Sequence, residues 1–126
     1  MPIPDHLLAA EYVNLATFRK NGDAVPTPIW AAPVGDKLYA FSEARAGKMK
    51  RLKNFSSVRL AECDRNGKLL GVWQEASAYK VEDSQEIEAA KRALEAKYTW
   101  KMKITDIASK IGRRYDKRAI IRIEMP

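Results

Sequence analysis

The sequence predicts a mainly β chain of the α+β class, in which six antiparallel strands form a small barrel with flanking helices. Three observations lead to this fold class. Short runs rich in β-branched and aromatic residues are typical of strands. The turn-forming pairs Asn21-Gly22, Gly35-Asp36 and Asn66-Gly67 separate several of these runs and favour hairpins. Helical periodicity interrupts the series twice, after the third strand and after the fifth.

The first three strands are expected at residues 12–19, 24–33 and 37–42, joined by tight turns into an antiparallel meander. Pro26 and Pro28 are two positions apart, so their missing N–H groups lie on the same side of the second strand. That side is expected to be a free edge, a bulge or a surface that meets something other than a neighbouring strand. The other strands are expected at residues 57–63, 69–81 and 118–124.

Helices are expected at residues 2–10, 44–55, 84–98 and about 104–111. Met49, Leu52 and Phe55 recur at three-residue spacing and give the second of these an apolar stripe. Acidic side chains begin the third, where the helix dipole favours them. The fourth has apolar residues at i, i+3, i+4 and i+7 and basic residues on its other face.

The composition is that of a globular protein, since 46% of the 126 residues are hydrophobic and 31% are charged. This length fits one domain, which we expect to span residues 1–126. One cysteine and one histidine exclude an intramolecular disulfide and argue against a zinc site, so no metal ligand is assigned. The sequence has no apolar run of membrane-spanning length and no basic leader of a secretory signal. We therefore expect a cytoplasmic protein without a membrane partner.

Positive charge is concentrated in two segments. The chain holds 23 Lys and Arg against 16 Asp and Glu, a net charge of +7. Residues 44–54 have five basic and no acidic side chains, and residues 100–118 have seven basic and two acidic ones. Such segments meet phosphate on nucleic acid, at an anionic membrane or on a cofactor, and a solvated helix face is the alternative. Nucleic acid fits least, because neither segment shows helix-turn-helix spacing or the aromatic pattern of single-strand binders.

The first basic segment contains a candidate phosphate site. Gly47 lies near an expected helix start, where backbone N–H groups and the helix dipole favour an anion, and Lys48 follows it. Lys48 and Arg51 are three residues apart, so both side chains can reach one anion. Arg45 in the preceding loop and Ser42 at the strand end are expected to complete the site.

Two stretches of the chain resemble a known family. Residues 12–54 read YVNLATFRKNGDAVPTPIWAAPVGDKLYAFSEARAGKMKRLKN, and residues 56–81 read SSVRLAECDRNGKLLGVWQEASAYKV. In this order they are similar to the pyridoxamine 5'-phosphate oxidase-like split-barrel superfamily of flavin and deazaflavin proteins, and most similar to its F420-dependent branch. The resemblance is close over about residues 8–82 and looser afterwards. It implies a six-stranded antiparallel split β-barrel with flanking helices.

The resemblance also implies a homodimer with cofactor sites at the subunit interface. It aligns Thr27, Pro28, Ile29 and Trp30 with a segment that runs along the cofactor ring, although Trp30 in an ordinary core is the alternative. It places the cofactor phosphate at Lys48. With Trp100 as a cap, the full set of expected cofactor-binding residues is Thr27, Pro28, Ile29, Trp30, Ser42, Arg45, Lys48, Arg51 and Trp100.

The expected function is that of an oxidoreductase that uses coenzyme F420, by preference, or FMN to transfer a hydride to a small organic acceptor. Coenzyme F420 is preferred because its oligoglutamate tail would suit the second basic segment. The chain lacks the R-x-V-L-L-K strand of pyridoxamine phosphate oxidases and has Val25-Pro26-Thr27-Pro28-Ile29-Trp30 instead, so oxidation of pyridoxamine phosphate is not expected. No catalytic residue is assigned, because the cofactor carries the reaction. The alternative is a flavin- or haem-binding protein without catalytic activity.

Overall fold

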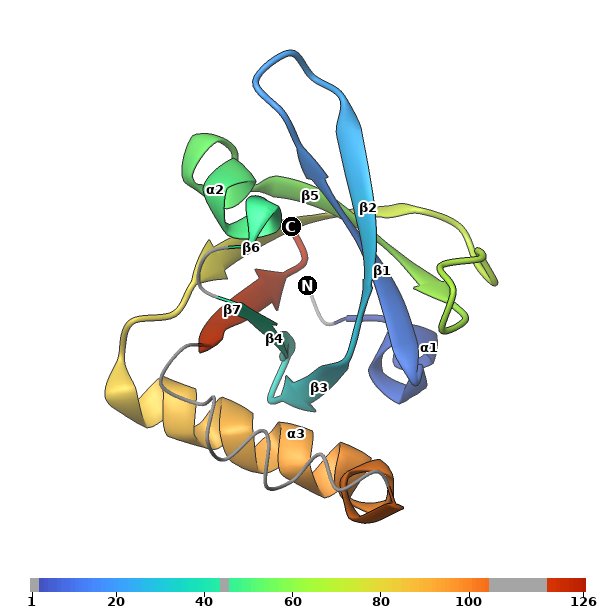
Figure 1. Ribbon diagram of the computed structural model, residues 1–126, viewed down its shortest axis with the longest axis vertical. Coiled ribbons are helices and arrows are strands. Elements are labelled where there is room, and N and C mark those ends of the chain that lie inside the picture. Colours follow the sequence, from blue (N-terminus) through green and yellow to red (C-terminus); the bar gives the residue numbers. More distant parts are fainter. Residues whose placement is uncertain (1–2, 44–45, 105–117) are drawn as a thin grey trace.

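The fold is described from a computed structural model, for residues 3–43, 46–104 and 118–126. In chain order the elements are α1 (Asp5–Ala9), β1 (Tyr12–Phe18), β2 (Ala24–Ile29), β3 (Ala31–Val34), β4 (Lys37–Glu43), α2 (Gly47–Asn54), β5 (Ser57–Cys63), β6 (Gln74–Lys80), α3 (Ser84–Ile104) and β7 (Arg118–Glu124) (Figure 1). The helix expected at about residues 104–111 lies outside the described residues, apart from its first residue.

The strands form one antiparallel sheet in the order β2-β1-β5-β6-β7-β4-β3, which confirms a mainly β fold with flanking helices. The sheet has seven strands rather than six, because the strand expected at residues 24–33 is interrupted at Trp30. Ile29 ends β2 and pairs with Val13 in β1, whereas Ala31 begins β3 and pairs with Ala40 in β4. The expected meander is therefore wrong. Two hairpins lie at opposite edges of the sheet and are joined at Trp30.

The connection at Trp30 forces the sheet to curl into a barrel. β2 and β3 are the two edge strands, yet only one residue separates them in the chain. Since consecutive Cα atoms are about 3.8 Å apart, the two edges must meet at this point. We call the line along which they meet the seam, defined by the free edge of β2 and by β3 with the adjoining end of β4.

The edge expected from the prolines is confirmed. Pro26 and Pro28 lie in β2, which pairs with β1 on one side and has no neighbour in the described sheet on the other. Because proline has no N–H group, the ladder bonds to β1 must come from Val25, Thr27 and Ile29. The carbonyl groups of both prolines consequently point away from β1, toward the seam.

The observed bounds of the remaining strands agree with the expected ones, except for those of β6. β5 and β7 cover the expected residues 57–63 and 118–124, but β6 begins at Gln74 rather than at residue 69. Residues 69–73 instead run beside the end of β5, where Leu69 bridges Cys63 and the Leu70 N–H group donates to the Glu62 carbonyl at 2.8 Å. The expected third helix continues six residues further, as α3, and has a non-helical backbone conformation at Tyr98.

Two hydrophobic clusters stabilise the fold. The first fills the barrel and includes Val13, Leu15, Leu38, Leu60, Ile121 and Ile123, all fully buried. The second lies between α3 and the outer face of the sheet, and it contains Ala32, Tyr39, Val81, Ala90, Leu94, Tyr98 and Ile120. Figure 1 shows α3 lying along this side of the barrel, next to β3. Among the described residues, no helix has the length and hydropathy needed to cross a bilayer.

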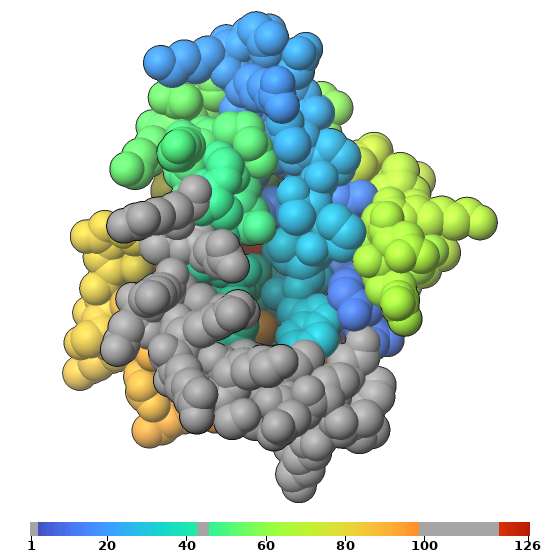
Figure 2. All heavy atoms as spheres, viewed as in Figure 1, coloured from blue at the N-terminus to red at the C-terminus, as the bar shows by residue number. Residues whose placement is uncertain are grey.

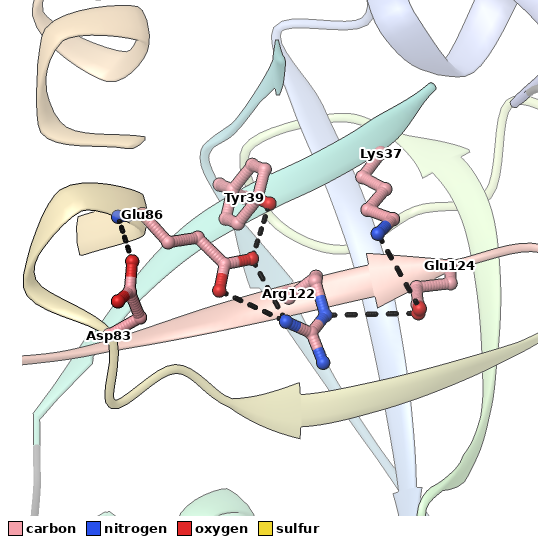
Figure 3. Close-up of polar contacts among 6 residues, drawn as sticks. All are labelled: Lys37, Tyr39, Asp83, Glu86, Arg122 and Glu124. Carbon is pink, nitrogen blue, oxygen red and sulfur yellow. Dashed lines mark hydrogen bonds and ion pairs between the residues drawn. The ribbon is translucent and has the colours of Figure 1, made fainter. Parts of the chain in front are cut away.

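A polar network fixes the first turn of α3 to the sheet (Figure 3). The Tyr39 hydroxyl donates to Glu86 Oε2 at 2.5 Å, and Arg122 Nη1 donates to both Glu86 oxygens at 3.0 Å. Arg122 Nε lies 3.7 Å from Glu124, whose other oxygen is 4.0 Å from Lys37. The hydrogen bond from Tyr39, together with Arg122, lowers the pKa of Glu86 although burial opposes this. The charged form of Glu86 therefore stabilises the folded state.

This arrangement predicts a pH dependence of stability. Because the pKa of Glu86 is lower in the folded chain, its contribution is present above the unfolded value near 4.5 and is lost as the pH falls through the folded value. We expect Glu86→Gln to be less stable than wild type at neutral pH and to lose less further stability below about pH 4.5. Urea denaturation between pH 3 and pH 7 measures both quantities. Glu88→Gln, on the exposed face and paired with Arg92, is the control and should keep the wild-type acid dependence.

Candidate functional site

The seam opens into a cavity at the point where β4 extends beyond its pairing with β3. β3 pairs with residues 37–40 of β4, so Phe41 and Ser42 continue beyond it, and they line the same cavity as residues of β2. A cavity of about 390 Å³ lies here, and Figure 2 shows a hollow between β2, in light blue, and α2, in green. It is lined by Tyr12, Pro28, Ile29, Trp30, Phe41, Ser42 and Lys48.

One wall of the cavity is aromatic and held in a fixed orientation. Trp30 stacks on Tyr98 with ring centroids 4.5 Å apart and an angle of 5° between the ring planes. Tyr12 packs against Trp30 at 6.4 Å and 57°. Offset stacking and tilted contacts at these distances are favourable and restrict ring motion. The wall is suited to a flat, apolar ligand.

A cation and a helix start lie at the other side of the cavity. Lys48 is the second residue of α2, and its half-buried side chain belongs to the lining. Ala46, the residue before α2, provides no side-chain acceptor for the first N–H groups of the helix, although its carbonyl accepts a hydrogen bond from the Met49 N–H group at 3.0 Å. N–H groups and a positive charge at one place favour an anion.

Arg51 has a different position from Lys48. Its Nε donates to Thr17 Oγ1 on β1 at 2.5 Å, which fastens α2 to the barrel. Its guanidinium folds back over the helix start, because a Cβ atom on Gly47 would lie 2.8 Å from Arg51 Nη1. Gly47 therefore leaves space for this side chain, and Arg51 lies beside the cavity rather than in its lining.

The structure brings five expected site residues together around the cavity: Pro28, Ile29, Trp30, Ser42 and Lys48. Thr27 is half-buried on β2 next to this group, outside the lining. Arg45 and the side chain of Trp100 lie outside the described residues. The role of all nine residues in cofactor binding stays a prediction.

Four further residues at or behind the cavity are outside the expected set of cofactor-binding residues. Tyr12 and Phe41 belong to the lining, and Lys97 and Tyr98 lie behind Trp30. Their local sequence contains no motif for a site. Only the pairing of β1 with β2, the overhang of β4 and the bend in α3 bring them together. The described residues contain no group of three or more His, Cys, Asp or Glu that could hold a metal ion.

Comparisons with known proteins concern the fold. No family model matches the sequence, and no curated protein matches it. Among solved structures, a conserved hypothetical protein from Mycobacterium tuberculosis is 21% identical with a TM-score of 0.71, over 94% of this chain and 74% of that one. An F420 reductase is 18% identical with a TM-score of 0.58, over 97% and 94% of the two chains.

A third solved structure is the heme storage protein HutZ from Vibrio cholerae. It is 12% identical with a TM-score of 0.66, over all of this chain and 92% of that one. These similarities lie in the arrangement of the strands rather than in the sequence. The chain has the split β-barrel fold of the pyridoxamine 5'-phosphate oxidase-like proteins.

Proposed function

We propose that the seam cavity binds a flat redox cofactor, coenzyme F420 by preference or FMN, and that the protein transfers a hydride to a small organic acceptor. One observation carries the proposal: an ordered aromatic wall and a lysine at a helix start line the same cavity. The F420 reductase among the matched structures supports the choice of cofactor.

The residues fit both parts of such a cofactor. Trp30 and Pro28 offer apolar surface to a ring, and Lys48 with the start of α2 offers a phosphate site. The carbonyl of Pro28 points to the seam and would accept a hydrogen bond from a ring N–H group. The volume of about 390 Å³ is within the range of small-molecule sites.

When bound, the cofactor supplies the hydride, and the chain has the task of positioning and shielding it. Trp30 and Tyr12 would exclude water from one side of the ring. Lys48 would anchor the phosphate so that the ring is held at a fixed depth in the cavity, with the acceptor entering on the open side.

A carrier of haem or flavin without catalytic activity is the second candidate, because the matched structures include a heme storage protein. The chain has one histidine, His6, and its ring lies 3.5 Å from the Gln74 amide rather than in the cavity lining. A haem in this cavity would therefore lack a histidine ligand from the lining. For this reason we favour a flavin or deazaflavin.

Binding titrations with coenzyme F420, FMN and haem test the proposal. We expect saturable binding of F420 or FMN, followed by changes in cofactor fluorescence and absorbance, and no comparable binding of haem. Oxidation of the reduced cofactor by added electron acceptors then tests catalysis. Binding of haem alone would replace the proposal by the second candidate, and binding of none would refute both.

We further propose a cytoplasmic homodimer with the cofactor sites at the subunit interface. The sequence predicts apolar surface on residues 58–61 and 71–78. In the first segment Val58, Leu60 and Ala61 are buried inside the chain, whereas in the second Val72 and Trp73 are exposed, next to exposed Leu69 and Leu70. Light scattering should give a mass near twice 14.3 kDa, and a monomer at micromolar concentration would contradict the proposal.

A further inference from the structure

Two neighbouring residues of α3 close the seam at Ala31, the first residue of β3. Lys97 Nζ donates to the carbonyls of Leu8, Ala10 and Ala31 at 3.0, 2.8 and 2.6 Å. The Tyr98 hydroxyl accepts a hydrogen bond from the Ala31 N–H group at 3.1 Å and donates to the Glu11 carbonyl at 2.8 Å. Two side chains thus join the segment before β1 to the first residue of β3.

The strand register explains why these contacts are made at Ala31. Pro33 cannot donate to β4, so the ladder bonds between β3 and β4 must come from Ala32 and Val34. The N–H and C=O groups of Ala31 therefore point away from β4, into the seam. Lys97 and Tyr98 take the place of a neighbouring strand for these buried groups, which would otherwise be costly to leave unpaired.

The same two residues lie directly behind the aromatic wall. Trp30 precedes Ala31, and its indole lies parallel to the ring of Tyr98, which is only 1% exposed. α3 leaves the helical conformation at Tyr98, with φ −113° and ψ 16°. The backbone directly after the indole, at Ala31, and one face of the indole are thereby fixed from outside the cavity.

We propose that Lys97 and Tyr98 are positioning residues for the bound ring, acting through Trp30. They hold the indole of Trp30 at one angle, so its side chain does not have to be ordered when a planar ligand binds against it. This inference rests on the proposed function, because it concerns a flat cofactor in the same cavity. It assigns part of the cofactor affinity to two residues that lie outside the cavity lining.

Tyr98→Phe is the main test, with Tyr39→Phe as its matched control. Each change removes one hydroxyl from a buried tyrosine in the same cluster between α3 and the sheet, but it is the ring of Tyr98 that stacks on Trp30. We expect Tyr98→Phe to weaken binding of F420 or FMN about 2- to 12-fold, the cost of ordering one side chain on binding. Tyr39→Phe should bind as wild type although it also unfolds more easily. Equal binding by both variants would overturn the proposal.

A measurement without cofactor separates this inference from the proposed function. The chain has three tryptophans, so Trp73→Phe with Trp100→Phe leaves Trp30 as the single reporter. In that background, Tyr98→Phe should lower the fluorescence anisotropy of Trp30 and increase its quenching by acrylamide, whereas Tyr39→Phe should not. Unchanged anisotropy and quenching would overturn the positioning role. Failure of wild type to bind any flavin or deazaflavin, with this difference intact, would refute only the proposed function.

Lys97→Met provides an independent variant, because it keeps the length of the side chain but leaves the three carbonyls without the ammonium group. We expect it to increase the mobility of Trp30 in the same single-tryptophan background. Lys91→Met, on the same helix and half-buried, should leave it unchanged. If both lysine variants behave alike, Lys97 has no positioning role.

Discussion

Lys48→Ala should weaken cofactor binding about 10- to 150-fold. A hydrogen bond between a charged side chain and an anion contributes roughly 1.5–3 kcal/mol, and this variant removes that hydrogen bond. The dipole of α2 favours an anion at the same place. Lys48 is the second residue of α2 and lines the cavity, so its loss acts on the ligand directly. Titration of FMN or F420 by fluorescence measures the change in dissociation constant.

Lys53→Ala is the control for charge alone. Lys53 lies on the same helix and is exposed, so its removal changes the net charge equally without altering the lining. We expect it to bind nearly as wild type. If both variants lose affinity by the same small factor, α2 acts only as a diffuse positive field, and if neither loses affinity, the phosphate site is not at α2.

Leu15→Ala should reduce the free energy of unfolding by about 2–5 kcal/mol. Leu15 is fully buried in the barrel interior, and its strand lies between β2 and β5, where it pairs with Thr27 and Leu60. Truncation loses buried apolar surface and leaves a cavity that the strands on both sides cannot fill. Urea denaturation measures the loss.

Leu70→Ala is the comparison, since Leu70 is 59% exposed in the segment before β6. Its truncation should change the unfolding free energy by no more than about 0.5 kcal/mol. An equal loss in both variants would contradict the burial that distinguishes these two leucines.

The fold class could be predicted from the sequence because its signals are local. β5 and β7 are short runs in which apolar residues predominate, and Asn21-Gly22 and Asn66-Gly67 mark sharp turns, with a left-handed backbone at both glycines. The break at Trp30 has no such signal. It follows from pairing with β1 before Trp30 and with β4 after it, and these partners lie on opposite sides of Trp30 in the sequence.

The same distinction applies to the candidate site. Lys48 is expected because a lysine after a glycine at a helix start has recognisable chemistry, and Trp30 because the family resemblance aligns it with the segment along the cofactor ring. Tyr12, Phe41 and Tyr98 are ordinary aromatic residues in the sequence. They reach the cavity or its wall only through strand register and the bend of α3, which no local pattern specifies.

The origin of the seam has an evolutionary consequence. The carbonyls of Pro26 and Pro28 point outward because β2 is an edge strand of the described sheet, whatever side chains surround them. Substitutions can therefore remodel the walls of the cavity while its backbone acceptors are inherited unchanged. The three solved structures described above share this fold at 12–21% identity. The chain path, and with it an edge strand that presents outward carbonyls, is thus compatible with wide changes of sequence.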